Sequence, residues 1–100
     1  MREIRLYRAS ALVLRQRNLA EADRIVTLFT RERGKLSAVV KGVKRPKSKL
    51  AAGTQLFTHS RFQLAMGRNL DVITQCEVVH PFHALHRDLT RLAAPSRPAN

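Results

Sequence analysis

Residue types that bind zinc recur near the end of the sequence, in the pattern Cys-x3-His-x2-His-x2-His formed by Cys76, His80, His83 and His86. Cysteine and histidine are the ligands that structural zinc sites use. His83 and His86 fall on a segment with helical spacing. Positions six apart on a helix differ by about 120° in direction, so three ligands would not converge on one ion. We expect capping or surface histidines, with no bound metal and no cofactor.

Residues that could perform catalysis are equally sparse. Glu21 and Asp23 have no third acid nearby, and loop acids commonly cap turns. The Gly-Lys pair at 34–35 is not a phosphate-binding loop, because Phe29 stands where that motif needs its first glycine and Leu36 where it needs Ser or Thr. No set of nucleophile, base and orienting group can be assembled. The sequence therefore predicts a protein that is not an enzyme.

Positive charge is the strongest chemical signal. Residues 41–49, KGVKRPKSK, hold five cations in nine positions and no acid. The whole chain has 19 Lys and Arg against 7 Asp and Glu, a net charge of +12. Residues 1–68 hold all of this excess, because the cations and acids of residues 69–100 are equal in number. Such asymmetry predicts a polyanionic partner, nucleic acid first and an anionic membrane surface second.

Length and composition indicate the general class of protein. One hundred residues suit one small domain, and a hydrophobic content of 44% is ordinary for a globular protein. Cys76 has no second cysteine to pair with, which agrees with a reducing cytosol, and its apolar surroundings predict an inert core thiol. The basic start has too short an apolar run for a signal peptide, and no stretch approaches membrane-spanning length. We expect a cytoplasmic protein that does not bind membranes.

Short strand-like runs separated by turn signals organise the chain. There are five such runs, at residues 9–17, 24–31, 35–43, 54–66 and 70–79. Gly34 is placed to take a left-handed conformation in a hairpin, and residues 67–69 give a second hairpin signal. The long basic connection after the third run has room for a short helix at 48–52, stopped by Gly53.

Alternation within the runs indicates which side chains share a face. The third run places Leu36, Ala38, Val40 and Gly42 on one face and Lys35, Ser37, Val39, Lys41 and Val43 on the other. The fourth run places Leu56, Phe62, Leu64 and Met66 on one face and Gln55, Phe57, His59, Arg61 and Gln63 on the other. After the fifth run, Pro81 suits a first helical turn, and apolar residues at helical spacing predict a helix at 81–93. A disordered tail is expected at 94–100.

Five short strands cannot bury both faces of an open sheet, and rolling them into a barrel removes the exposed edges. We therefore predict a mainly β fold, a five-stranded OB-fold barrel over residues 1–80 followed by one C-terminal helix. OB-folds bind oligonucleotides on the face of strands two and three and on the flanking loops.

The candidate nucleic-acid-binding residues are cations of the strands and of the basic connection, with one aromatic residue. They are Arg15, Arg17, Arg24, Lys35, Lys41, Lys44, Arg45, Lys47, Lys49, Phe57, Arg61 and Arg68. Lys35 and Lys41 alternate out from the apolar face of one run, so both could face a ligand. Phe57 either stacks on bases or belongs to the core. With aromatic residues so few, we expect binding dominated by charge, with little sequence preference.

The middle of the chain also closely resembles a known family, the N-terminal domain of RecO, the bacterial recombination mediator. The match covers about residues 7–90. It is carried by Asp23-Arg24, by Gly34-Lys35, by Gly42 with the basic stretch after it, by Phe57, and by GRNLDVITQCE at 67–77.

The resemblance implies an OB-fold that helps bind single- and double-stranded DNA. It also implies a role in annealing complementary strands and, with RecR, in helping RecA load onto DNA coated by single-stranded-DNA-binding protein. RecO proteins continue into a helical domain, often with a zinc-binding element, so the functions of that domain are not assumed for this chain.

Two other classes of function share the basic barrel. One is a structural RNA-binding protein of ribosome or translation-factor type, which would prefer folded RNA. The other is a binder of acidic membranes or acidic proteins, which would bind vesicles or such proteins without binding DNA.

Overall fold

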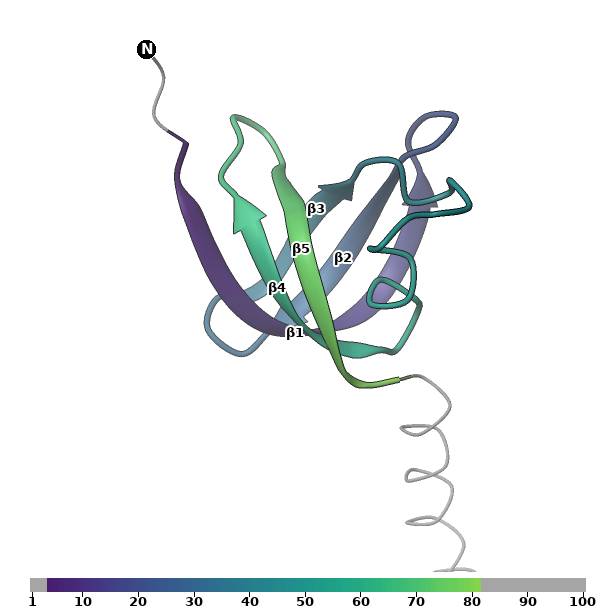
Figure 1. Cartoon of the computed structure of the whole chain (residues 1–100). Helices are drawn as coiled ribbons and strands as arrows, with labels where there is room; N and C mark the ends of the chain where they lie inside the picture. Colours follow the sequence, from purple (N-terminus) through teal and green to yellow (C-terminus); the bar gives the residue numbers. More distant parts are fainter. Residues whose placement is uncertain (1–3, 82–100) are drawn as a thin grey trace, which may run out of the picture.

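The computed structural model describes residues 4–81, which form a closed β-barrel (Figure 1). Its five strands are β1 (Leu6–Asn18), β2 (Arg24–Thr30), β3 (Gly34–Val40), β4 (His59–Ala65) and β5 (Asp71–His80). The order around the barrel is β1-β2-β3-β5-β4. Neighbouring strands are antiparallel, except that β3 and β5 pair in parallel over two residues each. Apart from Pro81, the predicted helix at 81–93 and the predicted tail lie outside the described residues.

Four connections join the strands. They are the β1–β2 loop (residues 19–23), the β2–β3 turn (31–33), the basic connection (41–58) and the β4–β5 loop (66–70). In Figure 1 the β1–β2 and β4–β5 loops lie at the top of the barrel, the β2–β3 turn lies at the lower left, and the basic connection runs down the right side. Gly34 has a φ of 71°, which confirms the predicted left-handed residue of the hairpin.

All five predicted strands are present, but the predicted helix at 48–52 is wrong, since residues 49–53 form turns and bends. Successive turns precede it, with Arg45 N–H donating to Gly42 O (3.1 Å) and Ser48 N–H to Arg45 O (3.1 Å). The hydroxyl of Ser48 then accepts from Leu50 N–H at 3.1 Å. A serine side chain that bonds the nearby backbone competes with helical backbone hydrogen bonds, which explains why no helix forms here.

The core is built by side chains that alternate inward along the strands. Its buried members are Ala9, Ala11, Val13, Val26, Leu28, Ala38, Val40, Val43, Phe62, Leu64 and Ile73. The predicted inward faces of the third and fourth runs are therefore confirmed for their central residues, but the prediction that Val39 and Val43 face the other way is wrong for Val43, which is part of the core, and Val39 is also buried. Leu56 and Met66 are exposed, because β4 spans only His59–Ala65 and both residues lie outside it.

A β-bulge bends β1. Val13 pairs with Leu28 and Arg15 pairs with Thr27, so Leu14 is an extra residue with no partner on β2. Bulges bend a strand and increase its twist. The bend lets one strand pair with β4 over residues 6–12 and with β2 over residues 11–18, which closes the barrel.

Candidate nucleic-acid interface

The β1–β2 loop is tied to the start of the basic connection by two hydrogen bonds. Gly42 N–H donates to Asp23 Oδ1 at 2.8 Å, and Lys44 N–H donates to Ala22 O at 3.2 Å. Gly42 has a φ of 66°, which residues with side chains rarely adopt. Asp23 thus caps a turn, as predicted for acids in this loop. Its carboxylate fixes where the basic connection leaves the barrel.

The strand register brings several cations to this end of the barrel. Arg24 lies between Asn18 on β1 and Val40 on β3. Arg17 precedes Asn18 on β1 and Lys41 directly follows the last residue of β3, so β1, β2 and the start of the basic connection each place a cation at the same end. We call this group, with the two cations that follow in the connection, the basic end: Arg17, Arg24, Lys41, Lys44 and Arg45.

Within the described residues, no carboxylate lies within 4.0 Å of a basic-end cation, and the Asp23 carboxylate next to Arg24 bonds the Gly42 backbone instead. The one pair of opposite charges within 4.0 Å in residues 4–81 joins Arg61 and Glu77. Four of the five basic-end side chains are exposed, and that of Arg24 is half-buried. Uncompensated, clustered cations raise the local concentration of polyanions. This end of the barrel can therefore accept phosphate groups without first breaking internal ion pairs.

Buried residues hold the basic connection against the barrel. Val43 is buried, and Leu50 packs against the core. Gly53 is also buried, and its carbonyl oxygen accepts a hydrogen bond from the Ser60 hydroxyl at 2.9 Å. Within the connection, the Thr54 hydroxyl donates to Leu50 O at 2.7 Å, which fixes the shape of the segment. These anchors leave the cations between them facing outward.

Lys44, Arg45, Lys47 and Lys49 are all exposed on this anchored segment. The predicted cations of the basic connection are thus displayed together. Arg15 is exposed on β1, beyond the bulge and two residues before Arg17.

Of the other predicted cations, Lys35 lies away from the basic end, whereas Arg68 lies in another loop of the same rim. Lys35 pairs with Phe29 beside the β2–β3 turn, whereas Lys41 follows the other end of β3. The structure therefore does not bring Lys35 and Lys41 together. Arg68 lies in the β4–β5 loop, which is at the same rim of the barrel as the β1–β2 loop in Figure 1.

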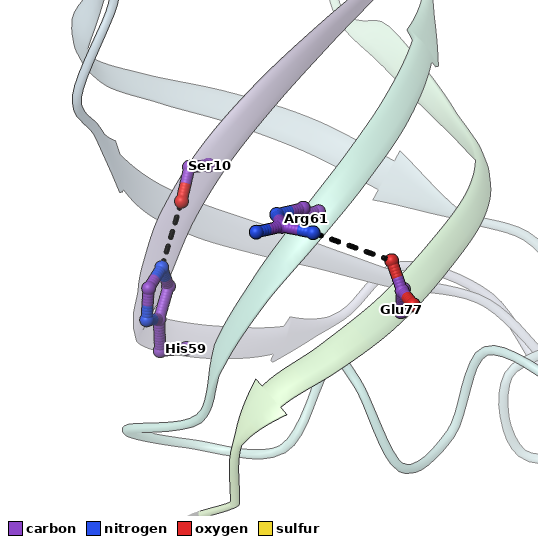
Figure 2. A network of polar contacts seen from close by, with 4 residues as sticks. All are labelled: Ser10, His59, Arg61 and Glu77. Atoms are coloured by element: carbon purple, nitrogen blue, oxygen red, sulfur yellow. Dashed lines mark hydrogen bonds and ion pairs between the residues drawn. The ribbon is translucent and has the colours of Figure 1, made fainter.

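Arg61 takes part in polar contacts on the outer face of β1, β4 and β5 (Figure 2). It lies 3.8 Å from Glu77, with both side chains largely exposed, so the pair contributes little to stability. The neighbouring His59 Nε2 lies 2.7 Å from Ser10 Oγ. Burial, then the charges of His80 and Arg61, lower the pKa of His59. The neutral form of His59 is therefore favoured here.

Phe57 lies in the basic connection before β4, so its prediction as a strand residue is wrong. It is 44% exposed, which also excludes the core interpretation. Its φ of 61° is uncommon for a bulky residue. Phe57 N–H donates to Val13 O at 2.7 Å, and Val13 N–H donates to Thr58 O at 3.1 Å. These bonds hold the Phe57 backbone beside the bulge of β1.

A second group of cations was not anticipated from the sequence. It surrounds the start of β1 and the β2–β3 turn, and consists of Arg5, Arg8, Arg31 and Arg33. The Arg33 guanidinium lies 4.0 Å above the ring of Tyr7, and the Tyr7 hydroxyl donates to Asp71. The sequence does contain a signal for this group. Arg31 and Arg33 flank Glu32 in the predicted hairpin after β2, so both arginines must lie near the strand that pairs with β2.

No group of three or more His, Cys, Asp or Glu able to hold a metal ion occurs among residues 4–81. His83 and His86 of the sequence pattern lie outside the described residues. Cys76 is free and half-buried, and burial raises the pKa of its thiol. No helix among the described residues is long and apolar enough to cross a bilayer.

The fold and its charges define a class: a small five-stranded β-barrel domain with a cluster of exposed cations at one end. The family described as "Recombination protein O N terminal" matches residues 1–82. The chain belongs to this family of RecO N-terminal domains, which confirms the resemblance found in the sequence.

Full-length relatives named "DNA repair protein RecO" are closely similar. The protein from Heliobacterium modesticaldum is 58% identical over 93 residues, which cover 93% of this chain and 34% of the relative. The protein from Symbiobacterium thermophilum is 50% identical over 88 residues, covering 88% of this chain and 35% of the relative. This chain thus spans about a third of the length of these curated relatives.

Proposed function

We propose that this domain is an OB-fold that binds DNA strands through its basic end and the adjoining cations Lys47 and Lys49. The observation that carries the proposal is that strand register and the hydrogen bond from Gly42 N–H to Asp23 gather five cations, none of which has an ion-pair partner within 4.0 Å among the described residues. The order β1-β2-β3-β5-β4, with its long connection after β3, agrees with an OB-fold, whose loops at this rim bind oligonucleotides.

The proposed role is that of a non-enzymatic, cytoplasmic DNA-binding domain in a recombination mediator that acts in DNA repair. Membership of the RecO family and the name of the relatives support this role. Within it we propose strand annealing and, through RecR, assistance to RecA on DNA covered by single-stranded-DNA-binding protein. The sequence resemblance alone supports these partners.

A salt series tests phosphate contact. If about five phosphates of a single strand are neutralised, log K should fall against log salt with a slope of about −3.5. We would measure this by fluorescence anisotropy with a 20-nucleotide strand. A flat response would reject phosphate contact as the source of binding.

Two charge-matched variants locate the surface. The first replaces Lys44, Arg45, Lys47 and Lys49 with Gln, and the control replaces Arg5, Arg8, Arg31 and Lys35 with Gln. Both remove four positive charges from the net +12. The first should lose most annealing activity and reduce the salt slope by about 3, whereas the control should keep both. Equal losses in the two variants would show that total charge, not the basic connection, drives binding.

A structural RNA-binding role remains the alternative. Binding that prefers folded RNA over single-stranded DNA, with the same dependence on the basic connection, would replace the DNA role with this one.

A further inference from the structure

One stretch of β1 has a strand on only one side. Residues 6–12 pair with β4, whereas pairing with β2 begins at Ala11. In residues 4–81 no strand lies on the β2 side of residues 6–9. An edge of this kind presents unpaired backbone groups that another chain can bond.

The hydrogen bonds at Ser10 show which backbone groups face this side. Arg31 N–H donates to Ser10 O at 2.9 Å, and Ser10 N–H donates to Glu32 Oε1 at 3.1 Å. The backbone groups of successive residues alternate in direction along a strand. The N–H and C=O groups of Leu6 and Arg8 therefore point to the same open side as those of Ser10.

The C-terminal part of β1, after residue 12, has no β4 partner, but another segment of the chain lies beside it there. The basic connection runs beside it, with hydrogen bonds from Phe57 N–H to Val13 O and from Gln16 Nε2 to Thr54 O (2.6 Å). Nothing in the described residues does the same for Leu6.

Charge around the open stretch favours an acidic occupant. Four exposed arginines border it: Arg5, Arg8, Arg31 and Arg33. The nearby acids are already bonded, Glu32 to Ser10 N–H and Asp71 to the Tyr7 hydroxyl. A second copy of the chain would bring another net charge of +12 to this place, which disfavours self-pairing.

Apolar side chains beside the open stretch add a second requirement. Ile4 is 74% exposed and Leu6 is 54% exposed. These two residues are two positions apart around the start of β1, the spacing that places side chains on one face of an extended chain. A strand that covers this edge would also remove apolar surface from water, which favours an occupant with apolar residues.

We propose that residues 6–8 of β1 accept an extended segment of a partner protein, rich in acidic and β-branched residues, as an additional strand of the sheet. The segment bonds the outward N–H and C=O groups of Leu6 and Arg8. Its carboxylates lie among the four arginines, and its apolar side chains contact Ile4 and Leu6. This site is at the opposite end of β1 from the basic end, so it goes beyond the proposed DNA binding and does not depend on it.

The probe is a capped, fluorescent eight-residue peptide that alternates Glu and Val, and its control alternates Lys and Val. We expect the Glu peptide to bind the full 100-residue chain at least tenfold more tightly. Hydrogen exchange should show protection of the Leu6 and Arg8 amides on binding. The Tyr7 and Ala9 amides, which face β4, should change little.

Two variants separate backbone pairing from charge. Leu6→Pro removes an N–H that faces away from β4, a place where edge strands tolerate proline. It should weaken peptide binding about tenfold while circular dichroism and DNA affinity are unchanged. Arg8→Glu keeps both backbone groups and should also weaken binding of the Glu peptide while improving binding of the Lys peptide. The neutralised basic-connection variant should bind the Glu peptide as the parent does.

Several results would overturn the proposal. They are equal binding of the two peptides, binding without protection of Leu6 and Arg8, or no binding at millimolar peptide. Concentration-dependent dimers that protect these amides would make a second copy the occupant. Loss of DNA binding in a folded Leu6→Pro variant would assign the edge to the nucleic-acid surface. Loss of DNA binding in the basic-connection variant alone would leave this proposal intact.

Discussion

Replacing Gly53 with alanine tests how the basic connection is held against the barrel. A Cβ atom at this position would lie 2.4 Å from Cys76 Sγ, 3.2 Å from Cys76 Cβ and 3.2 Å from Ser60 Oγ. The first distance is far inside ordinary van der Waals separation, so β5 and the connection must move apart. Cys76 and Ser60 lie on different strands, and Ser60 is fully buried, so little space is available for relaxation.

The expected loss of stability follows from two opposing effects. Overpacking a well-packed site lowers the free energy of unfolding by about 1–3 kcal/mol. Gly→Ala also restricts the unfolded chain, which raises it by about 0.4–1 kcal/mol. The overpacking effect is larger, so Gly53→Ala should be destabilising by about 1–2 kcal/mol in urea unfolding followed by circular dichroism.

The double variant Gly53→Ala with Cys76→Ala supplies the decisive comparison. Removing the sulfur relieves the shortest contact, so the double variant should be more stable than the sum of the single changes predicts, by about 0.5–3 kcal/mol. Relief should be incomplete, because Cys76 Cβ still lies close to the added methyl group. Strict additivity, or a Gly53→Ala variant as stable as the parent, would refute the packing of the connection on β5.

Three further predictions concern single side chains. Burial raises the pKa of Tyr7 from 10.0 to about 12, and the hydrogen bond to Asp71 and the charge of Asp71 act in the same direction. The stabilisation from the neutral phenol should therefore be complete below pH 10 and be lost as pH rises toward 12. Absorbance titration of this sole tyrosine measures that pKa, and Asp71→Asn should lower it. The pKa of His59 is lowered from 6.5, so the stability that its neutral form provides should be complete above pH 6.5 and fall as pH decreases through the folded-state pKa. An NMR titration in which His59 has a pKa above 6.5 would contradict this. Phe57→Ala should lower single-strand affinity by about fivefold or more if the ring stacks on a base, and Leu56→Ala, at a neighbouring exposed residue, should not. Unchanged affinity in a folded Phe57 variant would exclude stacking.

The strands could be predicted because their information is local. Alternation in KLSAVV placed Leu36, Ala38 and Val40 on one face, and two of these three are fully buried. Gly34 could be assigned to a left-handed turn because few other residues adopt that conformation at low cost. The basic connection could be recognised as a unit from its charge alone.

The missed features depend on contacts between distant segments. The Ser48 hydroxyl bonds the backbone of nearby Leu50, which is a local contact. Gly53, however, packs against Cys76 and Ser60 on two distant strands. No pattern in the local sequence indicates that this segment forms turns and not a helix. Phe57 continues the alternation of the fourth run in the sequence, yet its backbone turns to bond Val13 on β1. The separation of Lys35 from Lys41 follows from strand length, since they stand at opposite ends of β3.

The pairing of β1 explains why its two ends offer different chemistry. Only residues 11–12 have strands on both sides, because β4 pairs with residues 6–12 and β2 with residues 11–18. Each end of β1 therefore needs some other segment on one side. At one end the basic connection takes that place, and in doing so it brings its cations beside the β1–β2 loop. At the other end, the hydrogen-bond partners that the described chain supplies to the β1 backbone on this side are Arg31 and Glu32, both at Ser10. The same pairing of β1 therefore places cations for a polyanion at its C-terminal end and leaves unpaired backbone N–H and C=O groups for a peptide at its N-terminal end.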